Sequence, residues 1–260
     1  MKIAIFSLTR DRLPYTQLCF ERLREAAGHP FDHFVLDNGS QDGTREWLLS
    51  EYAHRRIHSL ELLPDNSGIS EGSNDCLRQI WSAHRWPGVP DGRCYYDLII
   101  KFDNDCWVES EDILSQIVEI YEDMRTFDPV WILSPRVEGL IHQPERVRDT
   151  MRGERRIGVT GIVGGLFQCV PARVYRKYRY PESLPLAKGQ DDHFCHWAQV
   201  NGARLGYIED LVVHHHETTN GQRLRFPEYF ERKRKEERHA AKDDKEATAE
   251  NSEAASGSGS

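Results

Sequence analysis

Two aspartates separated by one residue, Asp103 and Asp105, follow the clearest strand candidate of the sequence, residues 96–102. A short apolar run of this kind predicts a buried strand, so both carboxylates would stand just beyond its carboxyl end. Carboxylate oxygens suit Mg²⁺ or Mn²⁺, and substrate phosphates usually complete the coordination of such ions. With Asn104 between them, the two aspartates predict a site for a divalent cation and a diphosphate. The alternative interpretation is a plain turn.

Two more polar clusters follow predicted strands. Residues 37–40 come after the short apolar run 34–36, and residues 65–68 come after 60–63. Asp, Asn, Ser and Gly are also common turn residues, so either cluster alone could be a turn. In open α/β sheets, however, ligands bind beyond the carboxyl ends of the strands. Three polar clusters at such ends therefore favour a binding site at one edge of the sheet.

An acidic pair, Asp191 and Asp192, begins the predicted helix over residues 191–200. Aspartate at a helix N-terminus can simply cap the helix. It can also stay ionised there and take a proton from an attacking hydroxyl, as a general base does. The residues alone leave both interpretations open.

Three histidines, His214–His216, end the last predicted strand, residues 211–213. An imidazole could complete the coordination of a transition metal such as Mn²⁺; the alternative is that these side chains are exposed and have no role. The six cysteines are scattered without a Cys-x-x-Cys pair. A zinc site is therefore not predicted, and a reduced, cytoplasmic protein is expected.

The elements that must position these residues alternate through the first half of the chain. Strands are predicted at residues 2–8, 34–36, 60–63 and 96–102, and helices at 18–27, from 44 onward, at 70–84 and at 113–124. This alternation predicts an α/β fold with a mixed, mostly parallel sheet and helices on both faces. The second half is less regular, with strands predicted at 130–133, 164–170 and 211–213, a short helix from Pro171, and a loop over 137–159.

The composition limits the classes of function. The chain has 260 residues, of which 29% are charged, and a formal net charge of −8. This acidic balance gives no sign of a broad nucleic-acid surface, and no apolar run approaches the roughly 18 residues that span a bilayer. Residues 228–260 are almost entirely charged or small, so they are expected to form a largely disordered tail. The tail could begin as an exposed helix over 228–239.

Taken in order, these clusters resemble the family 2 glycosyltransferases of the GT-A fold, over roughly residues 2–217. Four segments carry the resemblance. Residues 35–44 look like the family's V-D-N-G-S-x-D-G-T segment, and residues 64–74 are similar to its N-x-G-x-x-x-G-x-N segment. Residues 103–105 fit the D-x-D motif, and residues 189–192 lie where a G-E-D motif is expected.

On the donor side, the resemblance implies that Asp37 accepts a hydrogen bond from the base of the nucleotide. Asp103 would face the ribose or the metal, and Asp105 would bind the cation that bridges the diphosphate. His214 would be the distal metal ligand, with its two neighbours left open as alternatives. The other donor-binding positions that the resemblance implies are Thr9, Arg12, Asn66, Gly68, Asn74 and Asn104.

On the acceptor side, the resemblance implies that Asp191 is the base of a single-displacement, inverting transfer. Gln190 stands where the family usually has Glu, which leaves Asp192 open as the base instead of Asp191. Gly164 and Gly165 resemble the family's small-residue segment beside the acceptor.

The implied function is a metal-dependent transfer of a sugar from a nucleotide-diphosphate donor, expected to be a UDP-sugar, to a hydroxyl acceptor, with Mn²⁺ or Mg²⁺ as cofactor. A Rossmann-like GT-A domain would cover residues 1–227, with a nucleotide-binding half at 1–107 and an acceptor-binding half at 108–227. One alternative is a sugar nucleotidyltransferase, but residues 8–11 lack the glycine of a phosphate loop. The other is a non-catalytic nucleotide-sugar-binding module, which would not need both aspartates of the D-x-D motif and a candidate base.

Overall fold

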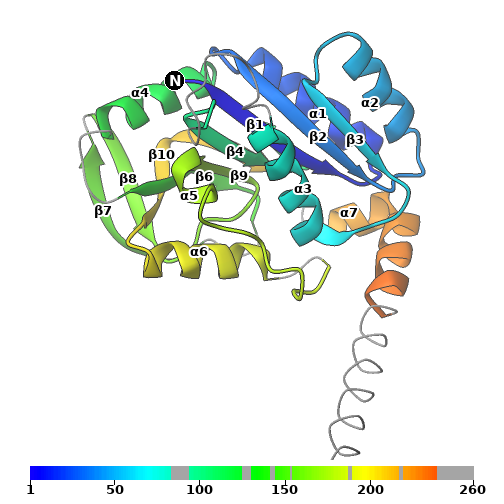
Figure 1. The fold of residues 1–260 in the computed structure, drawn as a ribbon. Helices are drawn as coiled ribbons and strands as arrows, with labels where there is room; N and C mark the ends of the chain where they lie inside the picture. The colour runs from blue at the N-terminus through cyan, green and yellow to red at the C-terminus, as the bar shows by residue number, and fades with distance from the viewer. Residues whose placement is uncertain are drawn as a thin grey trace, which may run out of the picture.

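The first half of the chain alternates strands and helices, as the sequence pattern predicts (Figure 1). The structure is a computed structural model, and it describes residues 1–82, 94–124, 130–140, 144–152, 154–186, 189–216 and 219–238. The elements of the first half are β1 (Ile3–Thr9), α1 (Leu13–Glu25), β2 (Phe31–Asn38), α2 (Thr44–Ala53), β3 (Ser59–Leu63), α3 (Gly68–Ser82) and β4 (Leu98–Phe102).

The second half adds more strands than the sequence pattern predicts. Its elements are β5 (Cys106–Val108), α4 (Ile113–Met124), β6 (Trp131–Glu138), β7 (Arg146–Arg152), β8 (Arg155–Thr160), β9 (Phe167–Pro171), α5 (Ala172–Tyr175), α6 (Gln190–Val200), β10 (Arg204–His215) and α7 (Thr219–Arg225). A further helix covers residues 227–238.

The ten strands of the described residues form one mixed sheet, in the order β3-β2-β1-β4-β9-β6-β10-β8-β7, with β5 paired to β10. The strands β3, β2, β1 and β4 are parallel neighbours, and β6 is parallel to β10. The strand β9 joins these two blocks through antiparallel pairing with β4 and β6. Because β1, β2 and β4 run in one direction, their carboxyl ends at Thr9, Asn38 and Phe102 meet at one edge of the sheet.

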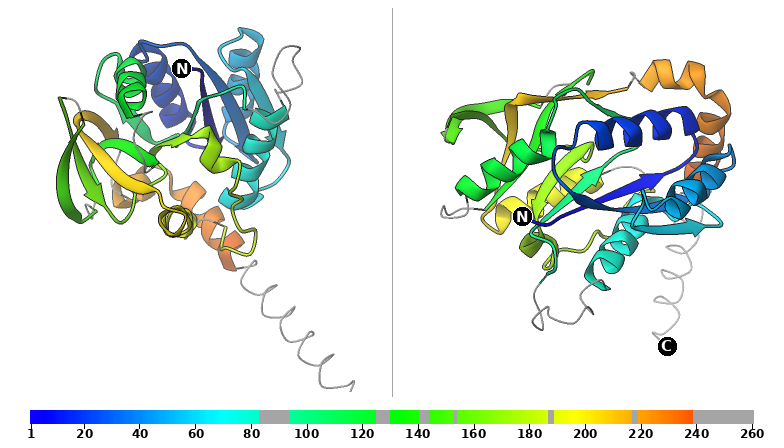
Figure 2. Two further views of the ribbon diagram at one scale, coloured as in Figure 1. Left: turned by 60° about the vertical axis from the view of Figure 1, so that its left-hand side comes forward. Right: turned by 90° about the horizontal axis from the view of Figure 1, so that it is seen from above.

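Helices cover both faces of this sheet, with α1 and α4 on one face and α3 and α6 on the other (Figures 1 and 2). The core runs through the sheet: the ring of Phe102 contacts Phe20 of α1 at 6.4 Å and Phe167 of β9 at 5.6 Å, between ring centroids. All three rings are fully buried. The end of β4 is therefore fixed by close packing of Phe102 in the core, and the Asp103–Asp105 turn begins from this fixed point.

The loop predicted over residues 137–159 is wrong, because this stretch contains the end of β6, all of β7 and most of β8. β7 is an edge strand whose side chains are mostly exposed, so it lacks the apolar alternation that marks a half-buried strand. The last strand is also longer than predicted, since it begins at Arg204 and not at Leu211. The polar residues Arg204 and Glu209 hide its pattern.

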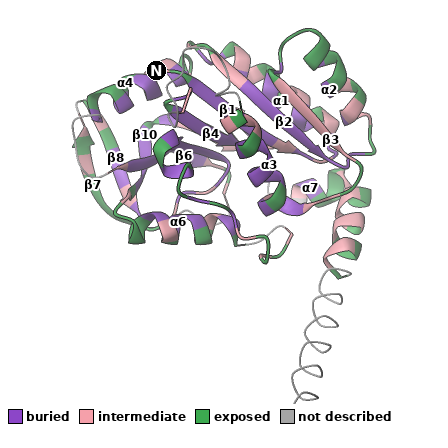
Figure 3. Cartoon of the chain, in the orientation of Figure 1, coloured by how far each residue is buried: buried purple, intermediate pink, exposed green. Residues whose placement is uncertain are grey.

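The start of the tail is described, and it is helical. The sequence allows an exposed helix from residue 228, and the helix over residues 227–238 is exposed on one side only. The other side, which includes Tyr229, Arg232 and Glu236, is partly buried near the carboxyl ends of β1 to β3 (Figures 1 and 3). The predicted tail beyond residue 238 and the end of the helix predicted at 70–84, from residue 83 onward, lie outside the described residues.

The six cysteines are free thiols. Within the described part of the chain, no helix is both long enough and apolar enough to cross a bilayer.

Candidate functional site

The carboxyl ends of β1, β2 and β4 border a cavity of about 270 Å³. This volume lies just below the roughly 300–1,000 Å³ that is usual for small-molecule sites, and the helix over residues 227–238 forms one wall of the cavity. The sheet edge contributes Thr9, Arg12, Asn38, Asp103, Asp105 and His215 to the lining, and the helix contributes Tyr229, Phe230 and Lys233. The edge at which the sequence predicts a donor site is therefore hollow.

Arg12 is held in the cavity wall by three side-chain hydrogen bonds. Its Nη1 donates to Asp105 Oδ2 at 2.9 Å and to Gln222 Oε1 at 2.7 Å, and its Nη2 donates to Asn104 Oδ1 at 2.9 Å. The guanidinium also lies 4.9 Å from the ring centroid of Tyr229. Burial lowers the pKa of Arg12, but the charge of Asp105, its hydrogen bond to Arg12, and the charges of Tyr229 and Asp103 together outweigh burial and leave this pKa raised. The guanidinium of Arg12 thus places a permanent positive charge in the wall of the cavity.

The backbone at the end of β1 is strained so as to aim Arg12 at this cavity. Asp11 and Arg12 both have positive φ angles, 50° and 59°, which are unfavourable for residues with a side chain. Hydrogen bonds hold the turn: Asp11 N donates to Ser40 Oγ at 2.7 Å, and Gln41 N donates to Asp11 Oδ1 at 2.7 Å. Such strain persists where the surroundings over-determine it, often at functional sites.

The Asp103–Asp105 turn presents two carboxylates of different character. Burial raises the pKa of Asp105, but Arg12 and His215 outweigh it and hold this pKa well below its usual range. Asp103 keeps 36% of its side chain exposed, yet burial and the neighbouring charges of Asp105 and Asp191 raise its pKa to about 6, although Lys101 opposes the rise. Asp105 is therefore firmly ionised, and Asp103 is the carboxylate that a new neighbour can perturb.

Of the three histidines, His215 is the one that faces the cavity. Its Nε2 lies 3.6 Å from Asp105 Oδ2, whereas the ring of His214 contacts Glu109 and lies 3.9 Å from Glu138. The ring of His216 stacks on Tyr15 at 4.4 Å. Successive side chains of a strand point to opposite faces, so His214 and His215 cannot both reach Asp105.

Asp37, the predicted contact to the donor base, is fully buried and already bonded. Its Oδ1 accepts from Thr9 Oγ1 at 3.0 Å and from Ser40 Oγ at 2.5 Å, and its Oδ2 accepts from Ser40 N at 3.0 Å and from Arg45 Nη1 at 3.3 Å. A carboxylate has about four acceptor positions, and these bonds use them. The neighbouring Asn38 lines the cavity, while Asp37 is not among its lining residues.

The residues predicted after β3 separate into two groups. Asn66 lines the cavity, and its Oδ1 accepts from Gly68 N at 3.0 Å. Gly68 has a φ of +83°, a conformation that favours glycine, and it starts α3 there. Asn74 lies elsewhere: its side chain exchanges two hydrogen bonds of 2.9 Å with the backbone of Tyr180. Asn74 thus anchors the segment before α6 and does not line the cavity.

Lys101 connects Asp191 with Asp103, because its ammonium group lies close to both carboxylates. Lys101 Nζ lies 3.3 Å from Asp191 Oδ1 and 3.7 Å from Asp103 Oδ1. On its other oxygen, Asp191 accepts a 2.8 Å hydrogen bond from Gly165 N. Gly164, by contrast, donates its N–H to Tyr207 Oη at 3.3 Å. Of the two candidate bases, Asp191 is therefore the one joined to the D-x-D turn.

The other acidic residue, Asp192, is exposed. Gln190, at the position where the resemblance predicts Glu, is buried and donates to Pro185 O at 2.7 Å. Its amide therefore holds the segment that leads into α6, and the helix start places Asp191 and Asp192 in different surroundings.

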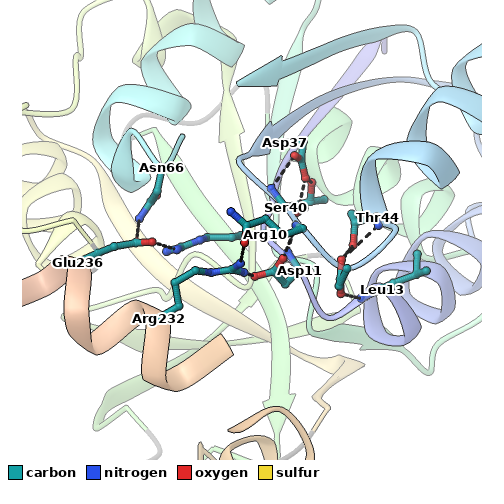
Figure 4. Close-up of polar contacts among 12 residues, drawn as sticks. Arg10, Asp11, Leu13, Asp37, Ser40, Thr44, Asn66, Arg232 and Glu236 are labelled. Carbon is teal, nitrogen blue, oxygen red and sulfur yellow. Dashed lines mark hydrogen bonds and ion pairs between the residues drawn. The ribbon is translucent and has the colours of Figure 1, made fainter. Parts of the chain in front are cut away.

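Charged side chains of the helix over residues 227–238 contact residues that follow β1 and β3 (Figure 4). Glu236 accepts from Asn66 Nδ2 at 2.9 Å with one oxygen and forms an ion pair with Arg10 through the other. Arg232 forms an ion pair with Asp11. A carboxylate of the chain itself thus bonds two residues that line the cavity, Arg10 and Asn66.

Sequence reasoning missed Lys101, Asn38 and the helix residues Tyr229 and Glu236. Lys101 had a signal, because a single charge stands inside the apolar run of residues 98–102, and a buried lysine needs a carboxylate partner. Asn38 had a weaker one, as the neighbour of Asp37 in the same cluster. The helix residues had none, since a charged tail has no pattern that points toward a site.

Comparison of the sequence gives no match to any protein-family model or to any curated protein. The fold, however, is similar to solved structures. One is S. aureus TarS 1–349 in complex with UDP-GlcNAc, with a TM-score of 0.60 and 15% identity over 82% of this chain and 58% of that chain. Another is the mannosyltransferase PcManGT from Pyrobaculum calidifontis in complex with GDP-Man and Mn²⁺, with a TM-score of 0.57 and 15% identity over 82% of this chain and 56% of that one.

A third similar structure is GalNAc-T7 with UDP, GalNAc and Mn²⁺, with a TM-score of 0.61 and 11% identity over 83% of this chain and 44% of that one. The chain thus spans between 44% and 58% of the length of these three proteins. All three are glycosyltransferases with a GT-A-like fold. The mixed α/β architecture of this chain, with its large sheet and flanking helices, is the GT-A fold.

Proposed function

We propose that the chain is a glycosyltransferase that moves a sugar from a nucleotide-diphosphate donor, a UDP-sugar, to a hydroxyl acceptor with inversion. The observation that carries the proposal is the neighbourhood of Asp191 and Asp103, which share the ammonium group of Lys101. An acceptor-side carboxylate and a carboxylate of the nucleotide cavity thus meet at one point. In this proposal residues 1–107 hold the donor and residues 108–227 hold the acceptor.

The side chains of Asp105 and His215 are suitable ligands for a divalent cation, Mn²⁺ or Mg²⁺. Asp105 offers a carboxylate firmly ionised at neutral pH, and the imidazole of His215 lies 3.6 Å from it. No group of three or more His, Cys, Asp or Glu side chains is placed to hold a metal among the described residues, so donor phosphates and water would complete the coordination. A bound cation would supply charge stabilisation for the departing diphosphate.

The chain's own residues would divide the remaining work. Asn38 and Thr9 border the cavity where the nucleotide would lie, and Asp103 would face the ribose. Asp191, 35% exposed and held by Gly165 N, would take the proton of the acceptor hydroxyl as the new bond to the anomeric carbon forms. Attack from the side opposite the diphosphate inverts the configuration of that carbon.

The test is to incubate the purified chain with a panel of UDP-sugars, Mn²⁺ and hydroxyl acceptors, and to measure UDP release and the anomeric configuration of the product. We expect UDP release that depends on Mn²⁺, rises with the right acceptor and gives the inverted anomer. Donor binding without any UDP release would support a binding module instead. Formation of a nucleotide-sugar from a nucleoside triphosphate and a sugar phosphate would support a nucleotidyltransferase.

A further inference from the structure

Lys101 is a charged residue placed where the fold has little tolerance for one. It stands in the middle of the sheet, in β4 between Ile100 and Phe102, and only 5% of its side chain is exposed. Removing an ammonium group from water costs several kcal/mol unless carboxylates compensate. Its two partners, Asp103 and Asp191, come from different parts of the chain: one ends β4, and the other begins α6.

The two aspartates are much more exposed to solvent than Lys101. Asp103 and Asp191 are 36% and 35% exposed, so a substrate can reach both. The lysine lies behind them and is almost fully covered. A substrate that contacts these carboxylates therefore does not need to contact Lys101, and any effect of the lysine on the reaction passes through its partners.

We propose that Lys101 is a positioning residue of the transfer reaction, which holds the Asp191 carboxylate in place beside the donor cavity. The inference rests on the proposed function, since it takes Asp191 as the base. Lys101 fixes Oδ1 of Asp191 and Gly165 N fixes Oδ2, so two contacts define the plane of the carboxylate. Each oxygen keeps a second acceptor position for the incoming hydroxyl.

The charge of Lys101 matters as much as its reach. Asp103 and Asp191 would repel each other without a cation between them, and the acceptor-side carboxylate would swing away from the donor. Burial by itself lowers the pKa of Lys101, but the two aspartates more than offset burial and leave this pKa raised. The ammonium group therefore stays charged at neutral pH.

Gly165 supports the same arrangement independently. A Cβ atom at this position would collide with Lys101 Nζ and would stand 2.7 Å from Asp191 Oδ1. The glycine has no positive φ to explain it, so the space taken by the lysine and the aspartate explains the missing side chain. Any larger residue at 165 must push Asp191 or Lys101 out of position.

The first experiment replaces Lys101 by methionine, which has a similar length and no charge. We expect K101M to lower kcat for transfer by at least tenfold, a larger change than in the Kd of the UDP-sugar in Mn²⁺ measured by calorimetry, which loses only the contact of Lys101 with Asp103. The control is K177M, which removes an exposed lysine and should leave both quantities unchanged. Transfer by K101M at the parent rate would overturn the proposal.

A double-mutant cycle with D191N then tests whether Lys101 acts through Asp191, because residues that act as a unit are not additive. We expect K101M/D191N to transfer at the rate of D191N alone. If the double variant is slower than D191N by the full factor of K101M, Lys101 acts elsewhere and the proposal fails. If D191N itself transfers at the parent rate, the proposed base is wrong, and this outcome is distinct from a failure at Lys101.

The second variant, G165A, keeps every charge and is informative even if K101M does not fold. The added methyl group displaces the same two side chains, so G165A should reproduce the loss of kcat with donor Kd retained. Its matched control is G161A, because a Cβ at Gly161 has no heavy atom within 4 Å, and this variant should match the parent. Parent-like transfer by G165A would overturn the proposal.

Discussion

Arg12 and His215 approach the same oxygen of Asp105, with Arg12 Nη1 at 2.9 Å and His215 Nε2 at 3.6 Å. A divalent cation bound to Asp105 must share this oxygen with the guanidinium or use the other oxygen of the carboxylate. Arg12 has two further acceptors, Asn104 and Gln222, so it can yield Asp105 without losing all its partners. Among the three histidines His215 is the one beside Asp105, so in the proposed function its imidazole would join Asp105 in binding the cation.

The first prediction concerns the metal. His215→Ala should weaken Mn²⁺-dependent donor binding by about 10- to 100-fold, the usual effect of disturbing a metal's surroundings. His214→Ala should change it by less than twofold, because His214 faces Glu109 and Glu138. Calorimetric titration of UDP with and without Mn²⁺ measures both variants. The reverse ranking would return the ligand to His214.

The second prediction concerns the base. Asp191→Asn should reduce kcat for transfer by about 10²- to 10⁴-fold, the usual contribution of general-base catalysis. Donor binding should persist, since Asp191 is not among the residues that line the cavity. Asp192→Asn is the matched control on the same helix turn, and its exposed side chain predicts a small effect. A larger loss in the Asp192 variant would exchange the two roles.

The third prediction concerns the helix over residues 227–238. Glu236→Ala removes a carboxylate that bonds Arg10 and Asn66, so an anionic diphosphate should bind more tightly, by up to about fivefold for an ion pair that is partly exposed. Glu231→Ala is the control, because Glu231 pairs with Lys235 at 3.2 Å within the same helix. Weaker donor binding in the Glu236 variant would mean that Glu236 builds the donor site and does not compete for it.

The fourth prediction concerns stability and pH. Burial lowers the pKa of His33 from 6.5 to about 3, and its ring packs 4.5 Å from Phe20, between ring centroids. Between these two pH values the unfolded chain binds a proton at this ring and the native chain does not, so the native state loses stability as pH falls from about 6.5 toward 3. From pH 7 to pH 5 this one group should cost about 2 kcal/mol.

Urea unfolding at pH 7 and pH 5 tests this directly. His33→Gln should lose about 2 kcal/mol less than the parent between the two pH values, whereas replacing the exposed His54 by Gln should leave the difference unchanged. Equal losses in the parent and the His33 variant would contradict the prediction.

The sequence was sufficient for the arrangement of the first half because β1 and β4 are buried and apolar, β2 and β3 contain short apolar runs, and polar residues follow each strand. The placement of Asp103, Asn66 and Asp105 at one cavity follows from that parallel arrangement. It was insufficient for β7, an exposed edge strand with polar residues on both faces. The first-half strands and β7 differ in burial. Apolar residues recur with the period of a strand only where one or both of its faces are buried, so an exposed strand shows no such pattern.

Within the site, the sequence could identify residue types but not the directions in which they point. Nothing in the run of three histidines distinguishes His215, and the choice depends on the register of β10 against β5. Asp37 matches a motif, yet its carboxylate is buried and accepts four hydrogen bonds from residues of the chain itself. The cavity is lined by the neighbouring Asn38. Lys101 was within reach of sequence reasoning, because a lone charge in a buried strand demands a partner.

The strand β10 pairs with β6 along most of its length, with β8 over Leu205–Ile208 and with β5 over Val213–His215. β10 therefore has hydrogen-bonded neighbours on both of its edges, at its start and at its end. Amide protons along β10 should exchange with deuterium only when the entire molecule unfolds, whereas those of the helix over residues 227–238 should exchange early. The deuterium pattern would then distinguish the strand that carries His215 from the helix that forms one wall of the cavity.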